Sequence, residues 1–299
     1  MSATTLSRAP PGDLDALTEI NTDDLLDAVG LARWRGTPLR RLFRWPARRF
    51  AHTAREFDRQ VALRGLAQGS AWMVQRMTGG LELHGVQQVP ASGPLCVLAN
   101  HPGMTDTVAL ISSLAVRPDL RIIALDRPFL RALPAVARRL IFVPDDDSDA
   151  GGAGRRAAVR ASMRHLQQGG ALLTFPAAGI EPDPAVHGPR RALAALDGWS
   201  ASFAVFARLV PGTVCLPALV SRVLDADAQR HPLTRLRRRP EDREKLAAAL
   251  QVATARYRRG SVRVAFGAPL PLGRGAADGA QAELLAALRR ELARLIEAA

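Results

Sequence analysis

The chain has 299 residues, 47% of them hydrophobic, and a formal net charge of +13 that is almost wholly arginine, because Lys245 is the only lysine. This balance predicts an acidic partner: anionic lipid, a phosphorylated substrate, an acidic carrier protein or nucleic acid. Charged residues interrupt the most apolar regions, so an integral membrane protein is not expected. The two cysteines, Cys96 and Cys215, lack metal-ligand spacing and are expected to be small core residues in a reducing compartment.

The first 79 residues divide by the sign of their charge. Residues 1–30 are acidic and polar, which predicts a loosely held acidic arm with one short helix over 14–29 and no secretory signal peptide. Residues 31–79 are predicted to form a basic amphipathic helical region, with ten arginines between Arg33 and Arg64 interleaved with aromatic residues and leucine. This helix can lie in a lipid headgroup layer, or it can be an ordinary surface helix whose aromatic face packs into the core.

Residues 80–275 are predicted to form an α/β domain, a single mostly β-α-β sheet flanked by helices, because strand-like apolar runs alternate with helical segments. Strands are expected over 81–86, 95–99, 120–125, 141–143, 171–175, 213–220 and 261–266, and helices over 106–116, 128–140, 155–168 and 193–209. Residues 145–154 are expected to form an exposed acidic loop, and 182–191 another loop. Residues 276–299 are predicted to contain a C-terminal amphipathic helix over 280–298.

The segment from Pro94 to Asp106 joins a buried strand to a helix. Leu95 to Ala99 is short and apolar, Asn100-His101-Pro102-Gly103 has turn chemistry, and Asp106 falls in the first turn of the next helix. His101 therefore stands at the carboxyl end of a strand, where open α/β sheets bind ligands. A carboxylate on one imidazole nitrogen leaves the other as a base near neutral pH. The alternative is a histidine that caps a helix or bonds a neighbouring carbonyl.

The nucleophile for such a base is expected to belong to a substrate, because the chain has no Gly-x-Ser-x-Gly elbow and Cys96 lies before the turn. Three blocks resemble the glycerolipid acyltransferase family, the lysophosphatidate-type acyltransferases. They are Asn100 to Asp106, similar to the N-H-x4-D block; Phe175-Pro176-Ala177-Ala178-Gly179, similar to the F-P-E-G-T-R block; and Val214 to Leu219, similar to the strand that follows. The resemblance, spanning roughly residues 80–225, implies acyl transfer from acyl-CoA or acyl carrier protein to a lipid hydroxyl.

The sequence departs from this family where the resemblance implies contacts to an acceptor phosphate. Asp145 and Ile180 stand where the family has arginines, Ala177 replaces a glutamate, and Glu181 follows late. A site without both arginines loses the charge-assisted bonds that hold a phosphate dianion, and an inward-pointing Asp145 would repel one. Lysophosphatidate is therefore not expected to be the preferred acceptor, unless arginines from elsewhere replace those two.

The sequence thus predicts a divergent acyltransferase at an anionic membrane surface, peripheral on the cytoplasmic face, acting on a lipid hydroxyl or amine without a metal or bound cofactor. His101 would take the acceptor's proton and Asp106 would orient His101, with oxyanion donors near Gly103 or in the turn from Ala177 to Gly179. The residues assigned to substrate binding are Asn100, Gly103, Phe175, Pro176, Ala177, Gly179, Glu181, Arg190 and Arg191.

Two other functions compete with this prediction. A degenerate family member would bind lipid or acyl carrier protein without catalysis. Nucleic-acid binding through the arginine clusters is not expected, because no recognition motif is present and the basic patches lie outside the central blocks.

Overall fold

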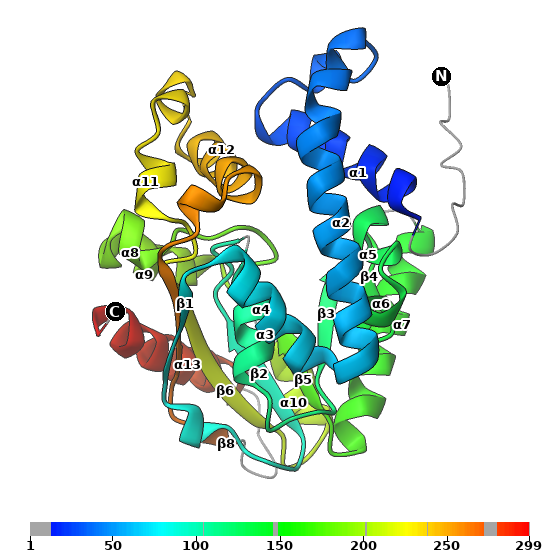
Figure 1. Cartoon of the computed structure of the whole chain (residues 1–299). Coiled ribbons are helices and arrows are strands. Elements are labelled where there is room, and N and C mark those ends of the chain that lie inside the picture. The colour runs from blue at the N-terminus through cyan, green and yellow to red at the C-terminus, as the bar shows by residue number, and fades with distance from the viewer. Residues whose placement is uncertain are drawn as a thin grey trace.

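Eight strands form one mixed sheet in the part of the chain that the computed structural model describes, namely residues 13–103, 105–145, 149–200, 202–237, 239–271 and 280–298. The strands lie in the order β1-β7-β6-β2-β5-β3-β4, and β8 pairs with β6. Their bounds are β1 Gly80–His84, β2 Leu95–Ala99, β3 Arg121–Leu125, β4 Leu140–Val143, β5 Ala171–Thr174, β6 Val214–Ser221, β7 Ser261–Phe266 and β8 Leu270–Pro271. Helices flank the sheet, which confirms the predicted α/β class (Figure 1).

Strand β2 lies in the interior of the sheet, between β5 and β6, and runs parallel to both. The outer strands β3 and β4 keep this direction, whereas β7 and β8 run antiparallel to β6. The carboxyl ends of β2, β5 and β6 therefore meet at one edge of the sheet. All five residues of β2 are fully buried, as expected for a strand covered by helices on both faces.

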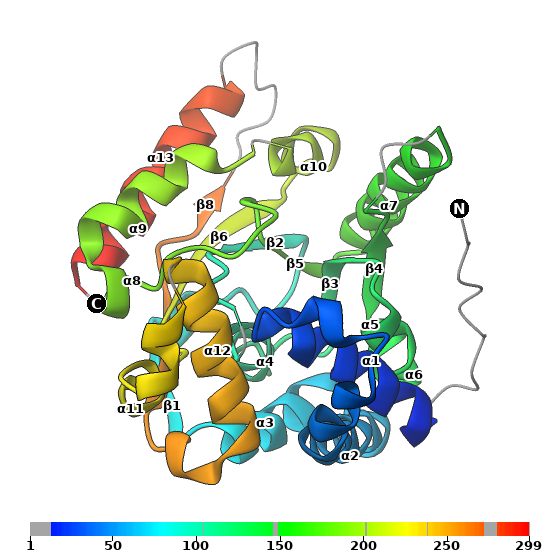
Figure 2. The same ribbon diagram turned by 90° about the horizontal axis from the view of Figure 1, so that it is seen from above.

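Helices cover both faces of the sheet, as Figures 1 and 2 show. Leu95, Val97 and Ala99 of β2 pack in a core that includes α2, α3, α4 and α12, whereas Cys96 and Leu98 pack with α7, α9, α10 and α13. The helix bounds are α1 Leu14–Ala28, α2 Arg41–Arg64, α3 Leu66–Met77, α4 Asp106–Ser113, α5 Pro128–Arg131, α6 Pro134–Ala137, α7 Asp149–Gln167, α8 Pro184–His187, α9 Pro189–Ala195, α10 Phe203–Leu209, α11 Ala226–Gln229, α12 Pro240–Ala253 and α13 Ala280–Glu297. Short 3₁₀ helices span Ala32–Trp34, Pro38–Arg40, Val86–Gln88, Leu196–Gly198, Pro232–Leu236 and Ala255–Tyr257.

The two cysteines occupy partner positions on neighbouring strands, Cys96 on β2 and Cys215 on β6. Both are buried free thiols, as predicted. Burial raises the pKa of both thiols, that of Cys215 to about 12. Neither is a thiolate nucleophile at neutral pH.

Several predicted helices and loops differ from the structure. The helix predicted over 128–140 is two short helices, because Pro134 disfavours helical dihedral angles at Leu133. The loop predicted over 182–191 contains α8 and the start of α9, which open with Pro184 and Pro189 at the first helical position. The helix predicted over 193–209 is broken between α9 and α10. Helix α7 begins at Asp149, inside the predicted acidic loop; residues 146–148 of that loop lie outside the described residues.

The expectation of a loosely held acidic arm is wrong for residues 13–30. Helix α1 packs along α2, and Leu17 and Leu26 are 0% exposed. Full burial of a leucine side chain contributes about 1.5–3 kcal/mol, so these two residues dock α1 firmly. Residues 1–12 of the predicted arm lie outside the described residues.

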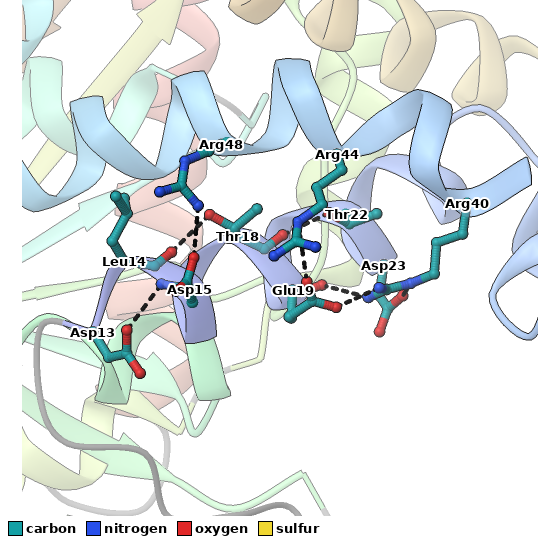
Figure 3. Close-up of polar contacts among 10 residues, drawn as sticks. All are labelled: Asp13, Leu14, Asp15, Thr18, Glu19, Thr22, Asp23, Arg40, Arg44 and Arg48. Carbon is teal, nitrogen blue, oxygen red and sulfur yellow. Dashed lines mark hydrogen bonds and ion pairs between the residues drawn. The ribbon is translucent and has the colours of Figure 1, made fainter. Parts of the chain in front are cut away.

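The acidic face of α1 is turned toward the arginines of α2 (Figure 3). Acidic residues spaced four apart on α1 meet arginines spaced four apart on α2 and in the 3₁₀ helix just before it, in the pairs Asp15–Arg48 at 2.6 Å, Glu19–Arg44 at 3.6 Å and Asp23–Arg40 at 3.0 Å. Exposed pairs of this kind contribute about 0–1 kcal/mol each, less than the buried leucines. Part of the basic charge predicted to face a membrane is therefore neutralised within the protein.

Candidate active site

The turn between β2 and α4 brings a histidine and an aspartate together. Nδ1 of His101 lies 2.7 Å from Oδ2 of Asp106, whose side chain is 1% exposed. The main-chain N–H of Gly103 donates to the same oxygen at 2.7 Å. Oδ1 accepts from the main-chain N–H of Thr107 and, at 2.9 Å, from its hydroxyl. The turn and the start of α4 thus hold the carboxylate in one orientation.

Opposing effects set the ionisation of His101. Burial alone would lower its pKa, but the hydrogen bond and charge of Asp106 and the charge of Glu181 together outweigh burial, so the pKa is raised above its ordinary value of 6.5. A carboxylate only accepts hydrogen bonds, so Nδ1 carries the proton and Nε2 is the basic nitrogen of the neutral ring. Within the described residues Nε2 makes no hydrogen bond, and 28% of the side chain is exposed. The pair can therefore take a proton from a group that enters the site.

Glu181 ties the His101 turn to the loop after β5. Its Oε2 accepts the main-chain N–H of His101 at 2.9 Å, and its own N–H donates to the His101 carbonyl at 2.8 Å. Its Oε1 accepts the indole N–H of Trp199 at 2.6 Å. Burial raises the pKa of Glu181, although these hydrogen bonds act in the other direction. The sequence assigned Glu181 to substrate binding. In the structure both of its carboxylate oxygens accept hydrogen bonds from the protein, so the side chain positions the His101 turn.

Asn100 makes a similar tie on the other side of β2. Its Nδ2 donates to the carbonyl of Val220 at 2.9 Å, and its Oδ1 accepts the Val220 N–H at 2.7 Å. The side chain is buried and holds β2 to the end of β6. Pro176 is also buried. Neither of these two residues, which the sequence assigned to substrate binding, lines the cavity described below.

The second sequence block lies beside the histidine. The Phe175 ring stacks on the imidazole of His101, with ring centroids 4.4 Å apart and ring planes 29° apart. The N–H of Ala178 donates to the Phe175 carbonyl at 3.1 Å and closes a turn in which Ala178 has a φ of +55°. The N–H groups of Ala177 and Gly179 make no hydrogen bond within the described part of the chain. They remain available to stabilise an oxyanion.

Gly103 is the point where the two blocks touch. Its φ is +92°, and a Cβ at this position would lie 3.1 Å from Cδ1 of Ile180. Both the backbone conformation and the contact favour glycine. The Gly103 N–H itself is donated to Asp106. Of the two turns that the sequence suggested for oxyanion donors, the Gly103 N–H is thus occupied, whereas the N–H groups of Ala177 and Gly179 are unoccupied within the described residues.

A cavity of about 220 Å³ opens beside this turn. One wall is formed by Pro102, Gly103, Ile180, Glu181 and Pro182, and the facing wall by side chains of α8, α9 and α12, namely His187, Arg191, Glu244, Lys245 and Ala248, with Leu224 between them. The volume is small for a whole lipid but suits a head group. Groups of both charge signs line it.

The polar side chains of the far wall form a short chain. Nη1 of Arg191 lies 3.3 Å from Nδ1 of His187, and the Nε2 of His187 contacts Oε1 of Glu244. A guanidinium only donates, so Nδ1 accepts and the Nε2–H of His187 donates a hydrogen bond to the Glu244 carboxylate. Arg191 and Lys245 have no carboxylate partner among the described residues. The sequence missed His187, Glu244 and Lys245 because no local pattern places α8 and α12 beside the turn at Pro102 and Gly103.

Two further residues lie away from this cavity. Arg190 is exposed and does not line it, although the sequence assigned it to substrate binding together with Arg191. Asp145 forms an ion pair with Arg127 at 3.1 Å and is about half exposed. Its carboxylate is therefore partnered, and the inward-facing repulsive group considered from sequence is not found.

Comparisons with known proteins add little to this geometry. No family model matches the chain, and no curated protein matches it. The structure is similar to the crystal structure of the 1-acyl-sn-glycerophosphate (LPA) acyltransferase PlsC from Thermotoga maritima, with a TM-score of 0.44 and 15% sequence identity over 91% of this chain and 94% of that chain. A likeness at this level leaves function to be inferred from the site itself.

Proposed function

We propose that the protein is an acyltransferase that moves a fatty acyl group from a thioester, acyl-CoA or acyl carrier protein, to a hydroxyl or amine of a lipid acceptor. The observation that carries this proposal is the 2.7 Å contact between His101 and the buried Asp106, which leaves Nε2 as an unoccupied base. The free N–H groups of Ala177 and Gly179 support it, because acyl transfer needs donors for an oxyanion. The sequence blocks that resemble glycerolipid acyltransferases coincide with these residues.

The chemistry would proceed by direct attack of the acceptor. Nε2 of His101 takes the proton of the acceptor hydroxyl or amine as its oxygen or nitrogen bonds to the thioester carbonyl carbon. Asp106 stabilises the imidazolium that forms, and the N–H groups of Ala177 and Gly179 hold the oxyanion. The carbon–sulfur bond then breaks, and His101 returns the proton to the departing thiolate. Phe175 keeps the imidazole plane in place through this cycle.

The acceptor head group is proposed to lie in the cavity next to Pro102 and Gly103. Arg191 and Lys245 supply positive charge there and Glu244 negative charge. A head group that carries both signs, or a neutral one, fits this mixture better than a phosphate dianion, which would face the nearby carboxylates. This supports an acceptor such as an amino-acid lipid or a lysophospholipid with an esterified phosphate.

The site is proposed to work at an anionic membrane surface, on the cytoplasmic face, in lipid metabolism. Helix α2 presents Leu42 and Trp45, each 69% exposed, and Arg41 and Arg64 have no ion-pair partner among the described residues. No helix in the described ranges is both long and apolar enough to cross a bilayer. Attachment through arginine is worth about 1 kcal/mol per residue near the surface and decays within a Debye length, so vesicle binding should weaken as salt rises.

The deciding experiment is incubation with acyl-CoA or acyl carrier protein thioesters and a panel of lipid acceptors, with products read by mass spectrometry. Product formation that disappears in His101→Ala supports the enzyme. Lipid or carrier binding that survives His101→Ala, with no product from the unaltered protein, identifies instead a catalytically degenerate binding protein. Product that persists in His101→Ala would refute the mechanism.

A further inference from the structure

A second cavity, of about 210 Å³, lies between α2, α3 and the segment around the end of α12. It shares no lining residue with the cavity beside His101. Arg49, Arg76 and Arg258 line it, with Phe50 and Trp72 as its aromatic wall. Figure 2 shows that α2, α3 and α12 lie along the same side of the molecule.

None of these three arginines has a carboxylate partner in the described part of the chain, in contrast to Arg44 and Arg48 of α2, which pair with acidic residues of α1. Arg258 donates to main-chain carbonyls, to Gln251 at 2.9 Å and to Arg76 at 3.1 Å, and so caps the last turns of α12 and α3. Arg49 lies 5.8 Å from the ring centroid of Trp45, and neither Arg49 nor Arg76 has an ion-pair partner within the described residues.

Two of these arginines also repel the third. Burial lowers the pKa of Arg258, and the charges of Arg49 and Arg76, which line the same cavity, lower it further, so each of these two cations lies close enough to Arg258 to act on it. Glu56 lines the same cavity, but Arg59 binds both of its oxygens at 2.8 Å and Gln60 donates to it as well. Its charge is therefore already matched. A bound anion would relieve the repulsion and use guanidinium donors that are otherwise free.

Apolar surface continues from this cavity along α2. Leu42, Trp45, Arg49 and His52 follow each other at spacings of three and four, which places them on one face of the helix. Leu42 and Trp45 are each 69% exposed, whereas Arg49 reaches the cavity. A ligand with an anionic group and an apolar part would contact both the arginines of the cavity and the exposed Leu42 and Trp45. A phospholipid has both parts, whereas a free phosphate has only the anionic one.

We infer that this cavity binds the phosphate group of an anionic phospholipid, held by Arg49 and Arg76 in front of the fixed guanidinium of Arg258. The exposed residues Leu42 and Trp45 lie beside the acyl chains of the same lipid. The site would orient the molecule on the membrane, and it does not depend on acyl transfer taking place.

The test compares Arg76→Gln with the control Arg64→Gln. Arg64 is an exposed arginine of α2 that does not line the cavity, and each variant loses one positive charge. Affinity is measured for phosphatidylcholine vesicles with and without phosphatidylglycerol, at physiological and at higher ionic strength. Arg64→Gln should lose at most about fivefold, the worth of one charge near an anionic surface. Arg76→Gln should lose about tenfold to a hundredfold, the worth of a charge-assisted hydrogen bond, and keep that loss at higher salt. Equal losses in the two variants would overturn the site and leave only diffuse attraction.

A second arm separates lipid from soluble phosphate. The thermal unfolding midpoint is followed with inorganic phosphate and with sn-glycerol 3-phosphate, because a ligand that binds the folded state raises it. The inference expects weak stabilisation by sn-glycerol 3-phosphate that Arg76→Gln removes, together with the vesicle effect above. Strong stabilisation by the soluble probes with vesicle affinity unchanged in Arg76→Gln would overturn the lipid assignment.

Discussion

Glu181 and His101 exchange hydrogen bonds in both directions: the Glu181 carboxylate accepts the His101 N–H at 2.9 Å, and the Glu181 N–H donates to the His101 carbonyl at 2.8 Å. This reciprocal pair joins the loop after β5 to the turn after β2. Because Trp199 holds the other carboxylate oxygen, the position of the base is set by a residue of the loop after β5 and not by its own turn alone.

Glu181→Gln tests this relationship. The carboxylate now accepts hydrogen bonds from the His101 N–H and from the Trp199 indole N–H. The glutamine amide has only one acceptor oxygen, so its NH₂ group would face one of these two donors and leave it unsatisfied. We expect a loss of about 1–3 kcal/mol in the free energy of unfolding, the cost of an unsatisfied buried donor, and a fall in kcat. Denaturant unfolding and steady-state kinetics measure the two effects. Unchanged stability would mean that the pair does not hold the turn.

His101→Ala and Asp106→Asn should both fold but differ in activity. Loss of the base should lower kcat/KM about 100- to 10,000-fold. Asp106→Asn keeps the size of the side chain but places an amide where Nδ1 and the Gly103 N–H now donate, so it should misorient the imidazole and cost activity to a different degree. Full activity in either variant would remove that residue from the mechanism.

The pH profile of kcat/KM should show an acid limb governed by His101. The base works only when deprotonated, and its pKa is raised above 6.5, so activity should fall as the pH drops through a midpoint above that value. In Asp106→Asn the interactions of Asp106 that raise this pKa are lost and only the charge of Glu181 remains, so the midpoint of the residual activity should move to lower pH. An unmoved midpoint would assign the limb to another group.

The raised pKa of His101 also makes the free energy of unfolding depend on pH. A histidine whose pKa is raised on folding stabilises the protein below its unfolded pKa, and this contribution is lost as the pH rises through the folded value. Asp106→Asn should therefore cost more stability at about pH 6 than at about pH 9. Urea unfolding at the two pH values measures the difference. A cost that is equal at both, or larger at the higher pH, would contradict the pairing.

The cavity beside the turn should decide the acceptor. Lys245→Gln and Arg191→Gln should lower kcat/KM for acceptors with a zwitterionic head by about tenfold or more, whereas Arg190→Gln, next in the chain but outside the cavity, should not. Lysophosphatidate should be a poorer acceptor than these. A clear preference for lysophosphatidate that disappears in Arg191→Gln would show that Arg191 and Lys245 have rebuilt a phosphate site.

Docking of α1 should depend on packing more than on charge. Leu17→Ala empties a fully buried position and should cost about 2–5 kcal/mol, whereas Arg44→Gln removes a half-exposed ion pair and should cost less than about 1 kcal/mol. Denaturant unfolding of the two variants measures both. A larger cost for Arg44→Gln would mean that ion pairs hold α1.

The sequence by itself determined the local features. The short, continuous apolar run of β2 predicted a buried strand. The five-residue spacing, with Pro102 and Gly103 in between, brings His101 and Asp106 together through one turn. Residues so close in the chain need no knowledge of the rest of the fold. The amphipathic helix α13 and most strands followed from periodicity for the same reason.

Only the tertiary structure decided what lies around that pair. The Glu181 contact spans 80 residues and depends on β5 lying next to β2, an order of strands that no local pattern encodes. Glu244 and Lys245 reach the cavity because α12 packs over the same sheet edge. The acidic residues of α1 outnumber the two leucines that dock it, so the pattern predicted an exposed arm, whereas in the fold these acidic residues face arginines of α2 (Figure 3). A contact between distant segments depends on the residues of both segments and on how their faces pack together. The sequence of one segment alone therefore does not determine it.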